Sequence, residues 1–189
     1  MGAQPLGRGT DDPSVMGNYA NISVLAKPDE NTITITRELD KGTGHNGVDV
    51  QTVDSTAVTG TTKVPGYIYT GNFSGCVFYL YKTGLDEMTG VHAYSGYVSE
   101  TTRKGFFRRK VINNVVREFS PQSYFARSGG RLIDRYETRG EIDPTTGENG
   151  LSFLSCVERT TITTFLFSLQ SSAEGSRVKR VLRVINLGY

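Results

Sequence analysis

A cysteine and a histidine that could form a catalytic pair lie close together in the middle of the chain, at Cys76 and His92. The whole sequence of 189 residues contains only two cysteines and two histidines. A cysteine beside an imidazole can ionise and act as a nucleophile near neutral pH. The sequence therefore directs attention to thiol chemistry in this segment.

Two predicted strands must position these side chains. Residues 76–82 are apolar or aromatic at both parities, which is typical of a strand covered on both faces. Residues 83–90 are rich in turn-forming types, and residues 91–98 have the pattern of a second strand. In a simple hairpin of this kind His92 would lie nearer Lys82 than Cys76. Contact between the thiol and the ring therefore requires an offset register or an intervening strand.

The motif around Cys76 resembles that of the cysteine glutamine deamidases. This group includes the catalytic domain of cytotoxic necrotizing factors, Burkholderia lethal factor and the chemotaxis deamidase CheD. Their shared pattern is a short Ser-Gly-Cys or Gly-Ser-Cys element that opens a strand, followed by a histidine at similar spacing. Here Ser74, Gly75 and Cys76 match the element, His92 matches the histidine, and Thr70 is similar to the threonine that precedes the cysteine. The resemblance covers about thirty residues, and Phe73 stands where leucine is usual.

The resemblance implies hydrolysis of the side-chain amide of a protein glutamine. Cys76 would attack the amide carbon, and His92 would move protons to the departing ammonia and from the attacking water. Thr70 would hold the imidazole through its hydroxyl or its backbone carbonyl. The oxyanion would be stabilised by the peptide N–H between Gly75 and Cys76, with the Ser74 hydroxyl as a further donor. No cofactor and no metal are implied.

Other interpretations of the same residues remain open. A free cysteine is often a small buried hydrophobe, and a histidine is often a satisfied core residue. The same thiol could serve a transglutaminase or a cysteine peptidase. A different class altogether is a non-catalytic β-sandwich binding module.

Composition sets limits on class and partners. A chain of 20.7 kDa is expected to form one domain, and we predict a flexible arm over residues 1–20 and a single catalytic domain over residues 21–189. A net charge of +2 favours neither nucleic acid nor membrane as partner. We expect a monomer that acts on a protein substrate, as the resemblance implies, such as a host GTPase or translation factor.

The sequence also leads to expectations about where the protein acts and about whether its two cysteines form a disulfide. The N-terminus lacks the features of a secretory signal, and no apolar run is long enough to cross a membrane as a helix. We therefore expect a bacterial toxin or effector that is secreted or delivered into the host cytosol by another route. Cys76 and Cys156 are expected to be free thiols, since a disulfide would inactivate the nucleophile.

The predicted fold class is α+β: a mixed β-sandwich with a few flanking helices and long loops. The sandwich follows from the resemblance, and many threonine, serine and glycine residues are consistent with it. Valines and Phe119 recur at helical spacing and predict a helix over 108–119. The adjacent basic run over 103–110 is either a solvated helix start or a patch for an acidic partner or a nucleic acid. Residues 127–150 are predicted as a charged loop, and His45 as a solvated turn residue. Strands are predicted at 32–36, 48–53, 151–157 and 160–170, and in the last segment.

Overall fold

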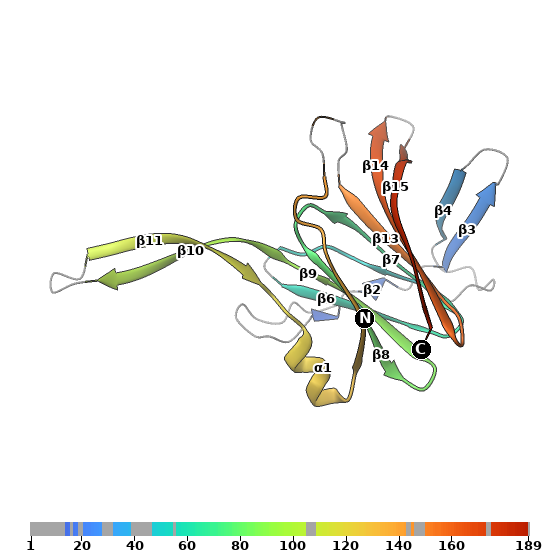
Figure 1. Ribbon diagram of the computed structural model, residues 1–189, viewed down its shortest axis with the longest axis horizontal. Helices are drawn as coiled ribbons and strands as arrows, with labels where there is room; N and C mark the ends of the chain where they lie inside the picture. Colours follow the sequence, from blue (N-terminus) through green and yellow to red (C-terminus); the bar gives the residue numbers. More distant parts are fainter. Residues whose placement is uncertain are drawn as a thin grey trace.

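A computed structural model of the chain describes residues 14–15, 17–18, 21–27, 32–38, 47–54, 56–104, 109–142, 145, 150–172 and 175–188. Within these ranges the protein consists mostly of β-strands in several sheets, and α1 (Gln122–Ser128) is the one α-helix among them (Figure 1). Side chains are described for a smaller set: 47–54, 56–97, 112, 116–142, 145, 150–169 and 178–188.

One sheet has five strands in the order β1-β6-β9-β8-β12. The short strand β1 pairs with β6 in parallel, and the remaining pairs are antiparallel. The bounds of its strands are Ser14–Val15 (β1), Ala57–Lys63 (β6), Val77–Gly84 (β8), Glu87–Ala93 (β9) and Arg131–Glu137 (β12). This sheet contains both Cys76, directly before β8, and His92 in β9.

A second sheet has six strands in the order β15-β14-β13-β7-β5-β2. Only β5 and β7 run parallel, so this sheet is also mixed. Its strands are Gly17–Asn18 (β2), Gly47–Val50 (β5), Gly66–Phe73 (β7), Leu151–Val157 (β13), Thr161–Ser172 (β14) and Gly175–Gly188 (β15). Thr70 lies in β7.

Two hairpins complete the strand set. Strands β3 (Asn21–Lys27) and β4 (Thr32–Glu38) pair with each other, and so do β10 (Ser95–Lys104) and β11 (Arg109–Glu118). The β10–β11 pair extends as a long arm away from the two larger sheets (Figure 1).

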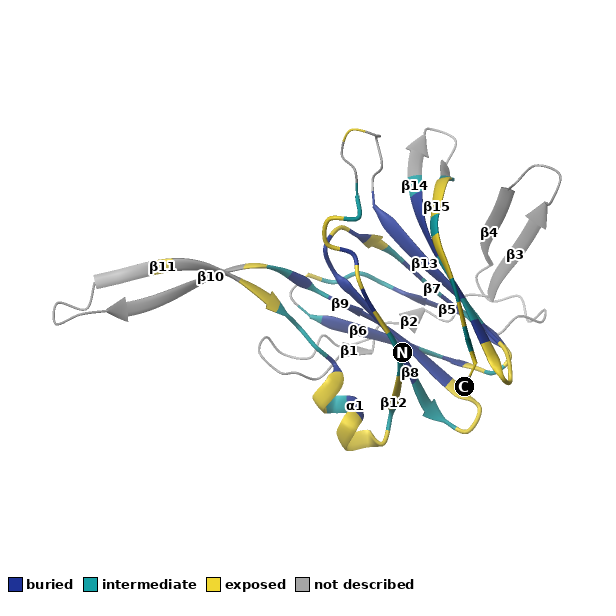
Figure 2. Cartoon of the chain, viewed as in Figure 1, coloured by how far each residue is buried: buried dark blue, intermediate teal, exposed yellow. Residues whose placement is uncertain are grey.

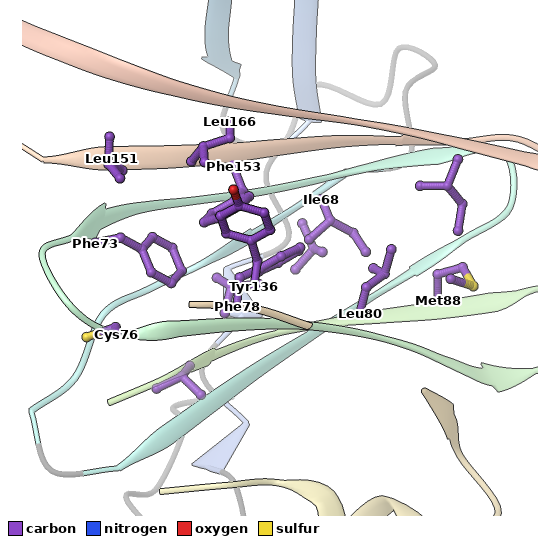
Figure 3. Packing of buried hydrophobic residues seen from close by; sticks show 14 of the residues in the cluster. Ile68, Phe73, Cys76, Phe78, Leu80, Met88, Tyr136, Leu151, Phe153 and Leu166 are labelled. Atoms are coloured by element: carbon purple, nitrogen blue, oxygen red, sulfur yellow. The ribbon is translucent and has the colours of Figure 1, made fainter. Parts of the chain in front are cut away.

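The main hydrophobic core takes side chains from both larger sheets. Phe78 and Leu80 of β8 pack there with Ile68 of β7 and Phe153 of β13 (Figure 3). The other face of β8 carries Val77, Tyr79 and Tyr81, which pack in a second cluster with Phe125 of α1. Strand β8 is therefore covered on both faces, as its uninterrupted apolar pattern predicts, and β8 and β9 are dark along most of their length in Figure 2.

The predicted helix over 108–119 is wrong, because this segment is strand β11. All ten of its residues pair in antiparallel register with β10. The apolar residues of the segment include Val111, Ile112, Val115 and Val116, which are β-branched and favour extended backbone. The expectation of a few flanking helices is also corrected: the described residues contain one short α-helix. Of the basic run, 105–108 lie outside the described residues.

Two further predictions about connections are corrected. Residues 83–90 are not a long turn, because Gly84 pairs with Glu87 and only Leu85 and Asp86 lie between them. Strand β9 therefore begins at Glu87, and the predicted strand over 91–98 is divided between β9 and β10. The predicted loop over 127–150 contains strand β12, which pairs with β8.

Several predicted strands are confirmed. Strand β13 has the predicted bounds of 151–157, and β4, β5, β14 and β15 overlap the other four predictions. Within the predicted arm, Ser14–Val15 and Gly17–Asn18 pair with β6 and β5, and the rest of residues 1–20 lies outside the described residues, as does His45.

Candidate active site

The side chain of His92 is buried in the main core. Met88 of β9 packs into the same core, and strand alternation places Gly90 and His92 on the same face as Met88. His92 is 1% exposed, and its ring stacks on the ring of Phe73 with centroids 3.8 Å apart and planes inclined by 18°. The stacking holds the plane of the imidazole in a fixed orientation.

Thr70 anchors the imidazole from the opposite sheet. Its Oγ1 lies 3.1 Å from Nδ1 of His92, and Thr70 itself is fully buried. The contact expected between Thr70 and the ring is therefore confirmed, and it runs through the hydroxyl. The two residues come from different sheets, so this contact depends on how closely the sheets approach.

Two glycines allow that close approach. Gly60 of β6 and Gly90 of β9 are direct register partners, two positions along β9 from His92. A Cβ on Gly90 would lie 2.5 Å from Cγ2 of Ile68, and one on Gly60 would lie 2.6 Å from Cγ2 of Val48. Both neighbours belong to the opposite sheet. The glycine pair thus leaves room for apolar side chains of the opposite sheet beside the histidine.

Cys76 lies at the end of a tight connection between β7 and β8. Gly75 has a φ of 142°, a conformation that favours glycine, and this lets the chain reverse just before the cysteine. Thr138, which follows β12, holds the connection from the other side. The Gly75 N–H donates to Thr138 Oγ1 (3.2 Å), while the Thr138 hydroxyl and N–H donate to the Cys76 carbonyl (2.8 and 3.3 Å).

Cys76 and His92 project from the same face of the same sheet. His92 is the register partner of Phe78, and Cys76 precedes Phe78 by two residues and packs into the same core cluster. Such diagonal neighbours on antiparallel strands lie about 7–8 Å apart between Cα atoms. The prediction that an offset register or a third strand separates them is therefore wrong. Strands β8 and β9 are direct hairpin partners, and the short turn brings His92 level with the start of β8.

The expected hydrogen bond between the thiol and the ring is not formed. Nε2 of His92 is buried and has no hydrogen-bond partner among the described residues. In Figure 3 the Cys76 sulfur points away from the rings of Phe73 and Phe78, at the edge of the cluster.

Burial keeps both groups uncharged near neutral pH. Desolvation lowers the pKa of His92 to about 3, so its imidazole is neutral. Desolvation also raises the pKa of the Cys76 thiol, and the backbone N–H of Ser95 opposes this shift by hydrogen bonding to the sulfur. Weaker influences on the same pKa are Asp54, which raises it, and Arg139 and the N–H of Ser74, which lower it. The site thus holds a thiol beside a neutral base rather than a preformed ion pair.

The predicted oxyanion donors are the N–H of the Gly75–Cys76 peptide, which belongs to Cys76, and the hydroxyl of Ser74. The neighbouring N–H of Gly75 donates to Thr138. Ser74 is exposed, and its own N–H is directed at the thiol. Gly75, by contrast, is buried.

The two central side chains of the site are enclosed. Cys76 is 7% exposed and His92 is 1% exposed. The residues around the thiol are more open: Asn72, Ser74, Tyr97 and Arg139 are exposed. Arg139 donates to Ser95 Oγ (2.9 Å) and lies over the Tyr97 ring, 5.9 Å from its centroid.

Three residues of the site are absent from the sequence-based prediction. Thr52 Oγ1 lies 3.3 Å from Nδ1 of His92, Thr138 holds the backbone of Cys76, and the Ser95 N–H reaches the sulfur. Thr52 and Thr138 lie at the ends of segments distant in sequence, and threonine is common throughout this chain. No local pattern distinguishes them from other threonines.

Other kinds of site find little support in the part of the chain that is described. None of its His, Cys, Asp and Glu side chains form a group of three suited to a metal ion, and none of its helices has the length and apolar character needed to cross a membrane. Cys76 and Cys156 are both free, as expected. In comparisons with known proteins, no family model, curated protein or solved structure matches the chain.

Proposed function

We propose that this protein is a protein-glutamine deamidase in which Cys76 is the nucleophile and His92 the proton-transfer group. The observation that carries the proposal is the hydrogen bond between Thr70 and His92. Cys76 and His92 were selected by residue type and by the resemblance, and Thr70 by the resemblance. Cys76 directly precedes β8, which pairs with the strand of His92, and Thr70 reaches the ring from the opposite sheet. An imidazole that is anchored through Nδ1, on the strand that pairs with the one opened by Cys76, supports this chemistry.

The reaction begins from neutral partners. As the sulfur attacks the amide carbon of the glutamine, Nε2 of His92 takes the thiol proton, and the N–H of Cys76 stabilises the oxyanion. His92 returns the proton to the departing nitrogen, and ammonia leaves a thioester. His92 then takes a proton from water as that water attacks the thioester. Collapse of this second intermediate releases glutamate and restores the thiol.

The proposal also includes the fold, the substrate class and the localisation that the resemblance implies. The two larger sheets would form the mixed β-sandwich of the deamidase family, with the catalytic residues at one end of their shared core. The substrate would be a host protein with an accessible glutamine, such as a GTPase or a translation factor, and the protein would act as a monomeric secreted or delivered toxin or effector. The chemistry requires no cofactor.

The test is conversion of glutamine to glutamate in host proteins. Host lysate is incubated with the wild type, Cys76→Ser, His92→Gln and Cys156→Ser, and tryptic peptides are compared by mass spectrometry. We expect the same glutamine to be converted by the wild type and by Cys156→Ser, and by neither of the other variants. His92→Gln is preferred to an alanine variant because the ring is fully packed against Phe73.

The same assay separates the related thiol chemistries. An added primary amine would be incorporated at the glutamine by a transglutaminase, and internal cleavage would identify a peptidase. Conversion that persists in a folded Cys76→Ser variant would contradict the deamidase proposal.

A second candidate function is a non-catalytic binding module, which the burial of the site favours. His92 is almost completely enclosed, and burial raises the pKa of the thiol rather than lowering it. In this case Cys76 and His92 would contribute only to packing in the hydrophobic core. The expected result would be no modified glutamine in any lysate and an unchanged binding partner for Cys76→Ser.

A further inference from the structure

Nδ1 of His92 contacts two threonine hydroxyls that come from different segments. Thr70 in β7 lies 3.1 Å from Nδ1, and Thr52, in the segment after β5, lies 3.3 Å away. The deamidase resemblance points to Thr70 only. The two hydroxyls differ in whether they can donate a hydrogen bond to Nδ1, and this difference determines which nitrogen of the ring carries the proton.

Thr52 has no proton to offer to the ring. Its Oγ1 lies 2.9 Å from the carbonyl oxygen of Gly71, which can only accept a hydrogen bond. The single hydroxyl proton of Thr52 is therefore directed at Gly71. Toward His92 the same oxygen can act only as an acceptor, so the contact is favourable only when Nδ1 carries the ring proton.

Thr70 alone would not select a tautomer. Its hydroxyl can donate to an unprotonated Nδ1 or accept from a protonated one, so its contact is compatible with either form. With Nδ1 protonated, the N–H is shared between the two threonine oxygens in a three-centre hydrogen bond. With Nδ1 unprotonated, its lone pair would face the lone pairs of Thr52.

The other ring nitrogen adds an independent argument. Nε2 of His92 is buried and has no hydrogen-bond partner among the described residues. If Nε2 carried the proton, a buried N–H donor would be left unsatisfied, which is unfavourable. Protonation at Nδ1 instead leaves a lone pair at Nε2, and this is the atom that must accept a proton if His92 acts as a base.

We propose that Thr52 is a positioning residue that holds His92 in the Nδ1–H tautomer, so that Nε2 is free to act as the base. The statement about the tautomer stands on the contacts of Thr52 alone, while its importance for turnover rests on the proposed deamidase function. Gly71 takes part through its backbone carbonyl, which fixes the direction of the Thr52 hydroxyl.

The experiment combines a spectroscopic measurement with kinetics. The ¹⁵N chemical shifts of the two imidazoles report which nitrogen carries the proton, and His45→Gln assigns the signals because the chain has only two histidines. The variants are Thr52→Val, which keeps the shape and removes the hydroxyl, and Thr52→Ser, which restores it. Thr56→Val is the matched control, because Thr56 lies in the same segment and its hydroxyl bonds to the carbonyl of Ala57 instead.

We expect Nδ1 protonation in the wild type, Thr52→Ser and Thr56→Val, and a shift toward Nε2 protonation in Thr52→Val. On the substrate found by the lysate assay, Thr52→Val should lower kcat roughly tenfold to a hundredfold with little change in KM, and Thr52→Ser should recover most of it. A wild-type ring protonated at Nε2, or an unchanged tautomer in folded Thr52→Val, would overturn the inference. If the tautomer shifts as expected but no variant deamidates any protein, the inference about Thr52 stands and the proposed function fails.

Discussion

Cys76 and Cys156 are both free thiols, but their surroundings differ in the groups that face the sulfur. For Cys156, burial and, to a smaller extent, the nearby charge of Glu158 together raise the pKa to about 11. For Cys76, burial also raises the pKa, but the backbone N–H groups of Ser95 and Ser74 and the charge of Arg139 act in the opposite direction. Cys76 therefore forms its thiolate more easily, although Cys156 is the more exposed of the two.

This difference predicts that iodoacetamide labels Cys76 faster than Cys156 near pH 8. A thiol with a pKa near 11 is about 0.1% ionised at that pH, and the thiolate is the reactive form. Both rates should rise with pH, because both pKa values lie above the usual range. The measurement is mass spectrometry of peptides after timed labelling of the native protein. Faster labelling of Cys156 would show that access, rather than ionisation, controls the chemistry at Cys76.

The connection between β7 and β8 depends on an element that is remote in sequence. Thr138 follows β12 and is fully buried, and its hydroxyl both accepts from the Gly75 N–H and donates to the Cys76 carbonyl. The backbone of Cys76 is thus held by a residue that directly follows β12, the edge strand of the same sheet. This explains how a sharp, glycine-dependent turn can present one cysteine in a defined position.

Loss of the Thr138 hydroxyl should therefore affect both stability and the reactivity of Cys76. Thr138→Val leaves two buried backbone groups without that partner, which costs about 1–3 kcal/mol in the free energy of unfolding. Thr138→Ser keeps the hydroxyl and should stay near the wild type. Urea unfolding measures the stability, and the alkylation rate of Cys76 measures its position. A Thr138→Val variant equal to the wild type in both would contradict the role assigned to this residue.

The packing of β9 against the opposite sheet depends on Gly60 and Gly90. Neither position can take a Cβ without displacing Val48 or Ile68. Thr70 follows Ile68 in β7, Thr52 follows the strand that contains Val48, and both threonines contact His92. A change in the distance between the sheets would therefore change the contacts of the imidazole.

Gly90→Ala is expected to lower the free energy of unfolding by about 1–3 kcal/mol, because the added methyl group overpacks the core. It should also weaken the contact between Thr70 and His92, which would be seen as a change in the His92 ¹⁵N shifts. Gly188→Ala is the control, since a Cβ there meets nothing closer than 3.9 Å. Equal stability of the two variants would show that the core at Gly90 adjusts without cost.

At the scale of the whole molecule, one buried imidazole makes stability depend on pH. Burial lowers the pKa of His92 to about 3 in the folded protein, whereas the unfolded chain has the ordinary value near 6.5. Between these values the unfolded state binds more protons than the folded state. The contribution of His92 is therefore fully present above about pH 6.5 and is lost progressively as the pH falls toward 3.

This linkage predicts a loss of about 2 kcal/mol in the free energy of unfolding between pH 7 and pH 5 from His92 alone. Urea unfolding of the wild type and of His92→Gln at the two pH values gives the test. Other titrating groups affect both proteins alike, so the difference between the two slopes isolates His92. Identical slopes would mean that the ring is charged in the folded state or reached by solvent.

Local sequence patterns predicted the strands correctly where the interactions that determine them are local in the sequence. The unbroken apolar run of β8 predicted a strand buried on both faces, and β13 has its predicted bounds. The resemblance of the motif to the glutamine deamidases predicted the contact between Thr70 and the ring. By contrast, helical spacing of valines in β11 was misleading, because strand pairing with β10 outweighed a weak periodic signal.

The sequence by itself determined which residue types could do chemistry, and the resemblance of its motif predicted that Thr70 and His92 should meet. Only the tertiary structure decided that the hairpin turn has two residues, that the imidazole is enclosed, and that Thr52 and Thr138 join the site. The physical reason is that each of these features depends on contacts between segments far apart in the chain. Whether a threonine reaches a histidine in another sheet depends on the separation of the sheets, which is set here by glycines and side chains that no short sequence window contains.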